Sequence, residues 1–283
     1  MRSVVIGATG IVGGHILDRL IERGERPIGL SRLKRESTVD VEWREGDLSV
    51  LETLQLPPFT ILYCTAHVGL LAAALPHLFR LSGPSLRRVV AFTSTSIVTK
   101  AESEIIAERE NVRQWAAAEQ QLIVACERLG IQWTVLRPTI IYEEGRDANI
   151  TRLSRLIERF GFMPLAGSGL GLRQPVHAED LAIGAVAAAA SAAAANKIYA
   201  IPGGDTITYR EMVGRIFDGM QRRRHIVAVP PALWRVAFAL AKPFVGNANV
   251  AMGSRMAKDM IFDATPAMRD FGWNPREFRP KFK

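Results

Sequence analysis

Short apolar segments alternate with helix-length segments over the first 140 residues, and this alternation restricts the possible folds more than any other feature of the sequence. The expected strands are Arg2–Gly7, Arg26–Ser31, Val41–Arg44, Thr60–Cys64, Arg88–Thr93 and Gln132–Arg137. The expected helices lie near Val12–Arg23, Leu48–Leu54, Gly69–Leu81 and Glu104–Leu129. Strand–helix units at this spacing predict an α/β fold, a doubly wound parallel sheet with helices on both faces.

A glycine-rich turn, Gly7-Ala8-Thr9-Gly10-Ile11-Val12-Gly13, follows the first expected strand and opens the first helix. Gly7 permits a tight turn, Gly10 lets the backbone approach a pyrophosphate, and Gly13 lets the helix pack closely on the sheet. The helix N-terminus supplies unpaired N–H groups and a positive dipole for phosphates. Because the strand and the helix are both in place, the motif indicates a Rossmann-type dinucleotide site, with a purely structural turn as the alternative. Thr9, Ile11 and Val12 are therefore expected cofactor contacts beside the three glycines.

The end of the second strand, Leu30-Ser31-Arg32, bears on which dinucleotide binds. A site for NAD would place a carboxylate here for the ribose 2′-hydroxyl, but the first acids are Glu36 and Asp40. Arg32 can instead hold a 2′-phosphate through its planar guanidinium. Ser31 and Arg32 thus predict NADP(H), and an exposed loop with ordinary basic residues is the alternative.

The later sequence predicts how this domain is completed. The alanine tract Ala185–Ala195, which Asp180 can cap, predicts a packed helix, and Lys197–Ile201 predicts a further strand. We expect an NADP-binding domain over 1–140, completed by about 176–201. A smaller lobe for a substrate or partner is expected over 141–175 and 202–283.

The net charge of +8 belongs almost entirely to the second half of the chain. Residues 1–140 carry 16 basic and 15 acidic groups, whereas residues 141–283 carry 20 and 13. A basic lobe can attract phosphorylated substrates or anionic lipid, or it can be an ordinary solvated surface. The apolar segment Trp234–Val245 predicts either a helix lining an apolar pocket or a surface-seeking helix. No aromatic interleaving of an RNA-binding type accompanies the charge, so nucleic acid is not an expected partner.

Two cysteines and five histidines show no metal-ligand spacing, so no metal and no disulfide framework are expected. The N-terminus leads directly into an apolar strand without a signal-peptide pattern, which favours a soluble, cytoplasmic protein. The uncharged stretch 53–79 is interrupted by prolines and histidines, and a buried strand followed by a helix explains it better than a membrane span.

Taken together, these motifs resemble the short-chain dehydrogenase/reductase superfamily, in its extended, NAD-dependent epimerase/dehydratase-like branch. The matching segments follow one another along nearly the whole chain: Gly7–Gly14 (GATGIVGG), Gly46-Asp47-Leu48, Cys64-Thr65-Ala66, Val90–Ser96, Leu136-Arg137-Pro138 with Ile141-Tyr142, Pro175–Leu181, and Asp263-Ala264 with Phe271–Pro275. The resemblance implies further cofactor contacts at Asp47, Leu48, Thr65, Ala66, His67, Thr93, Pro138 and Ile141. In many relatives long helices such as that over Glu104–Leu129 pair between subunits, which makes a homodimer one expectation.

The chain departs from the family's catalytic pattern in one respect. Relatives use a Tyr-x-x-x-Lys pair on the helix after the serine strand, and the tyrosine exchanges the proton. Here Asn111 and Trp115 stand at those two positions, and no tyrosine occurs between Tyr63 and Tyr142. The sequence therefore predicts an atypical active site without the usual acid/base.

Few side chains could replace the missing acid/base. Thr95 and Ser94 match the family's hydrogen-bonding hydroxyl, but either can equally bond the backbone at a strand end. Lys100 lies a few residues beyond them and is a further catalytic candidate, with a solvated loop lysine as the alternative. His67, at the carboxyl edge of the sheet, is expected to touch the cofactor or to act as an acid, or else to be structural.

Two functions remain open. The first is an NADP(H)-dependent oxidoreductase or epimerase acting on a carbonyl or alcohol carbon of a nucleotide sugar or a lipid-like substrate, whose diphosphate Arg173 or Arg222–Arg224 would meet. The second is a non-catalytic dinucleotide-binding redox sensor or accessory subunit, with the basic C-terminal lobe contacting a membrane or protein partner.

Overall fold

The computed structural model describes residues 2–230, 232–234 and 251–282. The chain divides into two compact units, each described here by itself. The first unit comprises 1–139, 178–201 and 263–274, and the second comprises 140–177, 202–262 and 275–283.

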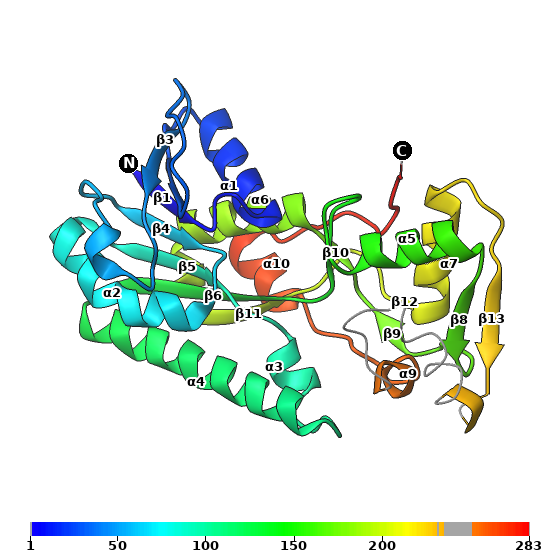
Figure 1. Cartoon of the computed structure of the whole chain (residues 1–283). Helices are drawn as coiled ribbons and strands as arrows, with labels where there is room; N and C mark the ends of the chain where they lie inside the picture. Colours follow the sequence, from blue (N-terminus) through cyan, green and yellow to red (C-terminus); the bar gives the residue numbers. More distant parts are fainter. Residues whose placement is uncertain (1, 231, 235–250, 283) are drawn as a thin grey trace. The chain divides into compact units, whose positions relative to one another are not determined.

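The first unit is built on a seven-stranded parallel sheet (Figure 1). Its strands are β1 (Ser3–Ile6), β2 (Ile28–Ser31), β3 (Glu42–Glu45), β4 (Ile61–Cys64), β5 (Arg88–Phe92), β6 (Gln132–Pro138) and β11 (Lys197–Ile201). Their order in the sheet is β11-β6-β5-β4-β1-β2-β3, and every neighbouring pair is parallel. The order reverses between β1 and β4, which is the switch point where doubly wound sheets bind their ligands. The predicted fold class and strands are confirmed.

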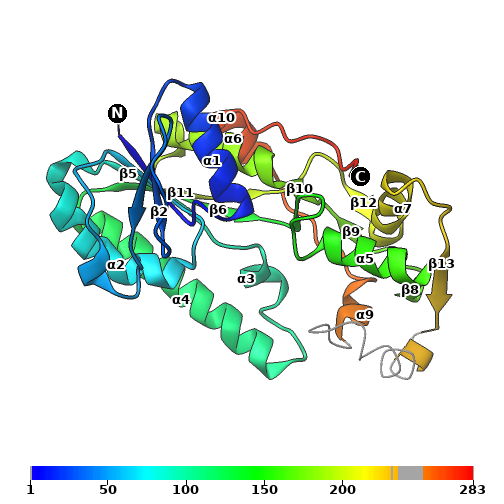
Figure 2. The same cartoon turned by 45° about the horizontal axis from the view of Figure 1, so that its top comes forward.

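Helices cover both faces of this sheet (Figure 2). The helices of the first unit are α1 (Ile11–Glu22), α2 (Val68–Ser82), α3 (Ser96–Thr99), α4 (Ile106–Arg128), α6 (Ala178–Ala190) and α10 (Thr265–Phe271), with short 3₁₀ turns η1 (Leu51–Thr53), η2 (Gly83–Ser85) and η3 (Ala192–Ala194). The pair α1 and α6 lies on one face, and the pair α2 and α4 lies on the other. Continuous Val/Ile runs in β1 and β5 are buried throughout because both faces of the sheet are covered.

The structure differs from the predicted elements in two places. The helix expected over Leu48–Leu54 is only the turn η1, because the Thr53 hydroxyl bonds the Val50 carbonyl at 2.6 Å and competes with helical pairing. The segment 263–274, predicted to be in the smaller lobe, belongs to the first unit. Its Trp273 ring fills the space where a side chain at Gly184 would stand, and Asp270 accepts the Tyr199 hydroxyl at 2.6 Å.

The second unit joins helices to three two-stranded sheets. Its strands are β7 (Ile141–Tyr142), β8 (Met163–Ala166), β9 (Leu172–Arg173), β10 (Val176–His177), β12 (Ile207–Thr208) and β13 (Ile226–Val229), and its described helices are α5 (Ile150–Phe160), α7 (Tyr209–Gly219) and α9 (Ala251–Arg255). A separate core, with Phe217 and Phe278 fully buried, holds these elements together. Most of the apolar segment predicted from Trp234 to Val245 lies outside the described residues. Among those that are described, no helix is both long enough and apolar enough to span a membrane.

Candidate dinucleotide site

The glycine turn joins β1 to α1 at the switch point of the sheet. Gly7 has a φ of +78°, and a side chain there would lie 2.3 Å from Thr65 Oγ1, which itself donates to the Gly7 carbonyl at 3.2 Å. A side chain at Gly13 would lie 2.2 Å from that same carbonyl oxygen. The turn thus needs glycine at both positions, one for its backbone angle and one for the close approach of α1 to β1.

The N-terminus of α1 is open for a phosphate. Gly10 is the N-cap, and within the described residues no side-chain hydrogen bond caps the first turn. Thr9 and Gly10 are exposed, whereas Val12 is buried in the core. The backbone of Gly10 and Ile11 is therefore the part of this motif that can cradle an anion, and the Val12 side chain packs the helix onto the sheet.

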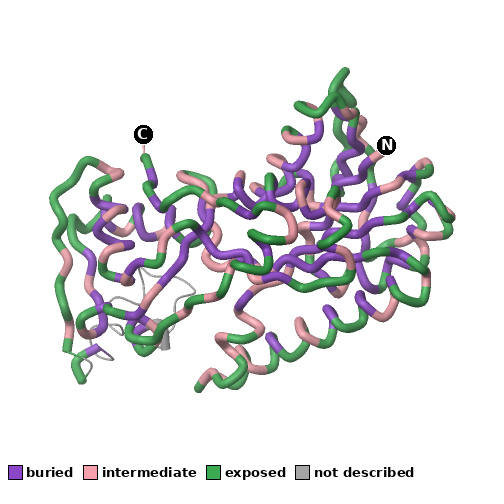
Figure 3. Tube along the Cα trace, turned by 180° about the vertical axis from the view of Figure 1, so that it is seen from behind, coloured by how far each residue is buried: buried purple, intermediate pink, exposed green. Residues whose placement is uncertain are grey.

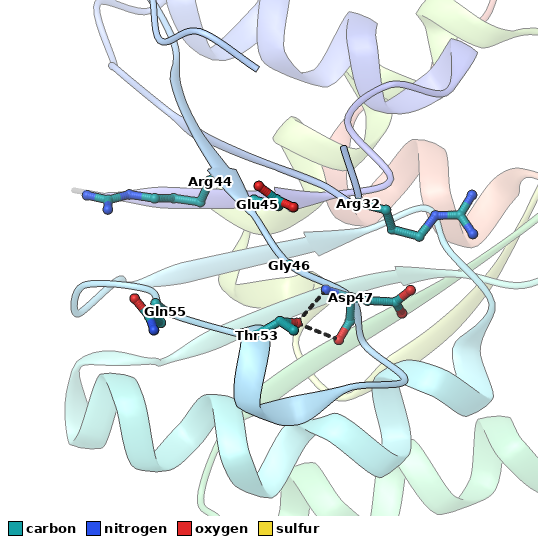
Figure 4. Close-up of a pocket in the computed structure, with 7 residues that line it drawn as sticks. All are labelled: Arg32, Arg44, Glu45, Gly46, Asp47, Thr53 and Gln55. Carbon is teal, nitrogen blue, oxygen red and sulfur yellow. Dashed lines mark hydrogen bonds between the residues drawn. The ribbon is translucent and has the colours of Figure 1, made fainter. Parts of the chain in front are cut away.

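A pocket of about 380 Å³ opens beside the ends of β2 and β3 (Figure 4). Its lining residues are Arg32, Arg44, Glu45, Gly46, Asp47, Thr53 and Gln55. The Asp47 N–H donates to Thr53 Oγ1 at 2.9 Å, so the turn η1 holds the aspartate backbone in place. Of these residues, Arg44, Glu45, Thr53 and Gln55 were not predicted, because they match no motif and only the turn of the chain brings them to the pocket.

Two arginines, Arg32 and Arg44, and two acids, Glu45 and Asp47, line this pocket. Hydrogen bonds from the Ser49 hydroxyl and N–H, with a smaller contribution from Arg32, hold the pKa of the Asp47 carboxyl below its usual value. The exposed Arg32 guanidinium makes no hydrogen bond or ion pair with the residues that the structure describes (2–230, 232–234 and 251–282). Ser31, at the end of β2, accepts the Leu33 N–H at 3.2 Å. Leu48 packs into the core and offers only its backbone.

The turn after β4 and the middle of α4 bring His67 and Trp115 together. His67 Nδ1 accepts the Gly69 N–H at 3.1 Å and caps α2, so the proton of the neutral ring is on Nε2. The ring meets Trp115 edge to face, with centroids 5.8 Å apart. Asn111, one turn earlier on α4, is exposed. An indole thus lies where the resemblance predicts a lysine.

The predicted hydroxyls at the end of β5 have different environments. Thr95 is buried, and its hydroxyl donates to the Pro138 carbonyl at 3.0 Å. Ser94 Oγ accepts the Ser96 N–H at 3.0 Å, and its own proton has no acceptor within the described part of the chain. Lys100 directly follows α3, and its Nζ lies 3.8 Å from a Glu108 carboxylate oxygen. Of the two hydroxyls, that of Ser94 rather than that of Thr95 remains able to donate a hydrogen bond.

A buried carboxylate that was not predicted as a site residue joins this edge. Glu119 on α4 accepts the Thr93 hydroxyl at 2.8 Å and the Arg137 Nε at 3.1 Å, and it also bonds Arg137 Nη2. Only 3% of Glu119 is exposed. The sequence signal was one acid on the apolar face of α4, between Ala118 and Leu122. This network fixes α4 against the ends of β5 and β6.

Ala66 and Pro138 lie in the first unit, and the predicted cofactor contact Ile141 lies in the second. Ile141 is in β7, and the next residue, Tyr142, packs edge to face on His177 and on Phe278. The two tyrosines of the first unit, Tyr63 and Tyr199, are buried within the sheet.

The arginines expected to meet a diphosphate differ in their environments: Arg173 is buried, whereas Arg222, Arg223 and Arg224 are exposed. Arg173 is buried and donates to the carbonyls of Leu172, Arg255 and Lys258, so that prediction is wrong for this residue. Arg224 pairs with Glu211 and Asp218. No cluster of histidine, cysteine or acidic side chains suited to a metal ion occurs among the described residues.

The chain was compared with known proteins. The NAD dependent epimerase/dehydratase family profile matches residues 3–201. UDP-glucose 4-epimerase of Vibrio cholerae is 23% identical over 158 residues, which are 56% of this chain and 46% of that protein. The mitochondrial NADH dehydrogenase (ubiquinone) 1 alpha subcomplex subunit 9 of Arabidopsis thaliana is 31% identical over 134 residues, which are 47% of this chain and 31% of that protein. The matched region thus spans less than half the length of either relative.

Solved structures share the architecture at low identity. UDP-glucose 4-epimerase of Thermotoga maritima, solved with UDP-glucose, matches with a TM-score of 0.70 at 16% identity, over 98% of this chain and 94% of that one. MoeE5, solved with UDP-glucuronic acid and NAD, matches with a TM-score of 0.73 at 17% identity, over the same shares. At these identities the likeness establishes the fold. With the family profile covering the glycine turn and the whole sheet, the chain belongs to the NAD dependent epimerase/dehydratase family.

Proposed function

We propose that the chain binds NADP(H) at the carboxyl edge of the seven-stranded sheet. This proposal rests on the exposed Arg32 guanidinium, because the end of β2 (Leu30-Ser31-Arg32) carries no carboxylate for a ribose 2′-hydroxyl. The two carboxylates of the same pocket, Glu45 and Asp47, lie at and after the end of β3 instead. The residues present fit such a dinucleotide. The open N-terminus of α1 suits the pyrophosphate, and Asp47 with Thr53 and Gln55 offers polar groups for the adenine.

Replacement of Arg32 tests this assignment. We expect Arg32→Ala to weaken NADPH binding about ten- to a hundredfold and to leave NADH binding unchanged, since charge-assisted hydrogen bonds contribute about 1.5–3 kcal/mol. Arg35→Ala is the matched control, because the Arg35 guanidinium packs over the Trp43 ring at 5.1 Å. Equal weakening of both cofactors, or of both variants, would refute a 2′-phosphate contact at Arg32.

We further propose an oxidoreductase or epimerase reaction at a carbonyl or alcohol carbon of a nucleotide sugar or lipophilic substrate. Family membership and the UDP-sugar epimerases among the similar proteins support this reaction class. When bound, the nicotinamide supplies hydride exchange. Ser94 is the group on this chain that can donate a hydrogen bond to the substrate oxygen, and the acid/base is then non-standard because no tyrosine lies on α4.

The variant Ser94→Ala distinguishes a catalytic role of the Ser94 hydroxyl from a structural one. We expect it to lower kcat for UDP-galactose epimerisation or for reduction of an aliphatic aldehyde panel by about ten- to a hundredfold, with NADPH affinity unchanged. Ser96→Ala is the control, because only the Ser96 backbone takes part in the turn at Ser94. Turnover that survives Ser94→Ala would exclude this role.

A non-catalytic dinucleotide-binding protein is the second candidate. It is favoured by the engagement of Thr95 with a backbone carbonyl, by the proximity of Lys100 to Glu108, and by the sequence likeness to an NADH dehydrogenase subunit. Tight NADPH binding without turnover across the UDP-sugar and aldehyde panels would support this candidate. Turnover would overturn it.

A further inference from the structure

Two segments of the second unit lie side by side at the parallel pair β8–β13 (Figure 1). The Met163 N–H donates to the His225 carbonyl at 2.9 Å, where the two strands begin to pair. Arg222 Nη1 donates to the Glu158 carbonyl at 3.2 Å, near the end of α5. The turn between α5 and β8 and the connection from α7 to β13 therefore form one continuous surface.

Large apolar side chains are exposed on this surface. Phe160 and Phe162, on either side of Gly161, are 41% and 43% exposed, and Val227 on β13 is 49% exposed. Gly161 ends α5 with a φ of +75°, a turn conformation that glycine adopts readily. Figure 3 shows the neighbouring connection from α7 to β13 as largely exposed. Grouped, exposed aromatic side chains of this kind mark a binding surface.

Cations surround these aromatic side chains. The Arg159 guanidinium lies over the Phe160 ring at 5.4 Å, and Arg222 and Arg223 are exposed beside it. Arg223 has no hydrogen-bond or ion-pair partner within the residues described. We call the six residues Arg159, Phe160, Phe162, Arg222, Arg223 and Val227 the α5–β13 patch.

We propose that the α5–β13 patch docks the protein on an anionic lipid surface. Phenylalanine side chains enter the boundary between headgroups and acyl chains, while guanidinium groups bind the phosphates above it. The charge is complementary to anionic lipid, since the patch carries three arginines and no acidic side chain. This proposal is independent of dinucleotide binding, which rests on the first unit.

Co-sedimentation of the full chain with vesicles tests the proposal. The vesicles are pure phosphatidylcholine or phosphatidylcholine with 30% phosphatidylglycerol, at 0.1 M salt. We expect binding to the anionic vesicles only. The double variant Arg222→Glu/Arg223→Glu should bind them at least about tenfold more weakly, and Phe160→Ser/Phe162→Ser should show a similar loss.

Matched controls distinguish an effect of the patch on vesicle binding from the effects of total charge and of misfolding. Arg80→Glu/Arg128→Glu changes two exposed arginines of the first unit and lowers the net charge equally, and Val39→Ser removes an exposed apolar side chain elsewhere. Both should bind vesicles like the wild type, and every variant should retain the wild-type unfolding midpoint and NADPH affinity. The proposal is overturned if the wild type does not bind anionic vesicles or binds both vesicle types equally. It is also overturned if the control variants lose vesicle binding as the patch variants do. A protein that binds the patch when the vesicles do not would likewise overturn it.

Discussion

The contact between Gly13 and the glycine turn leads to a quantitative prediction for Gly13→Ala. A side chain there would lie 2.2 Å from the Gly7 carbonyl oxygen, 2.7 Å from the Gly7 carbonyl carbon and 2.9 Å from the Ala8 Cα. All three atoms are backbone, so no rotamer change relieves the overlap. The turn and α1 must separate by about 1 Å to reach ordinary contact distance. Overpacking of this kind costs about 1–3 kcal/mol of unfolding free energy.

The same displacement acts on the N–H groups that would hold the pyrophosphate. Loss of one charge-assisted hydrogen bond corresponds to about 1.5–3 kcal/mol, so we expect NADPH affinity to fall about ten- to a hundredfold. Calorimetric titration measures the affinity, and urea unfolding measures the stability.

Gly14→Ala is the matched control on the same helix. Its added methyl group would have only the Ala8 carbonyl oxygen nearby, at 3.8 Å. Alanine in a helix interior gains about 0.5–1 kcal/mol over glycine, so this variant should be slightly more stable and bind NADPH normally. Wild-type affinity in Gly13→Ala, or an equal loss in both variants, would refute the reasoning.

Three further predictions concern buried groups. Burial raises the pKa of both cysteine thiols to about 12, so neither should react with a thiol reagent at pH 8 until the protein unfolds. Glu119→Gln should cost about 3 kcal/mol in urea unfolding, because it leaves Arg137 without its carboxylate. Burial would raise the pKa of Glu144, but hydrogen bonds from His177 and backbone groups lower it below its usual 4.5. The stabilisation that the ionised Glu144 carboxylate gives the folded protein is therefore complete above pH 4.5 and is lost as the pH falls through the lowered pKa. The unfolding free energies of the wild type and of Glu144→Gln should consequently converge in acid.

Local patterns predicted the parallel sheet and the glycine turn well, because both depend on neighbouring residues. The strand over Lys197–Ile201 has the predicted limits, and the turn at Gly7 follows β1 as the motif requires. The residues of the dinucleotide edge that the motifs predicted, such as Thr65 and Asp47, lie at strand ends, since parallel strands bring their carboxyl ends to one edge.

What could not be predicted depends on contacts distant in sequence. Arg173 resembled a diphosphate ligand, but two of its three carbonyl partners, Arg255 and Lys258, lie more than eighty residues later in the chain. The place of Trp273 beside Gly184 likewise requires the fold. Glu119 differs from other helix acids only because Arg137 and Thr93 reach it from two strand ends.

The central claim is that this chain selects the dinucleotide that carries a 2′-phosphate. Calorimetric titration of the wild-type protein with NADPH and with NADH, under one buffer and salt condition, tests it most directly. Because Arg32 makes no ion pair within the described part of the chain and the end of β2 carries no acid, we expect NADPH to bind at least about tenfold more tightly than NADH. Equal affinity, or tighter binding of NADH, would contradict the account.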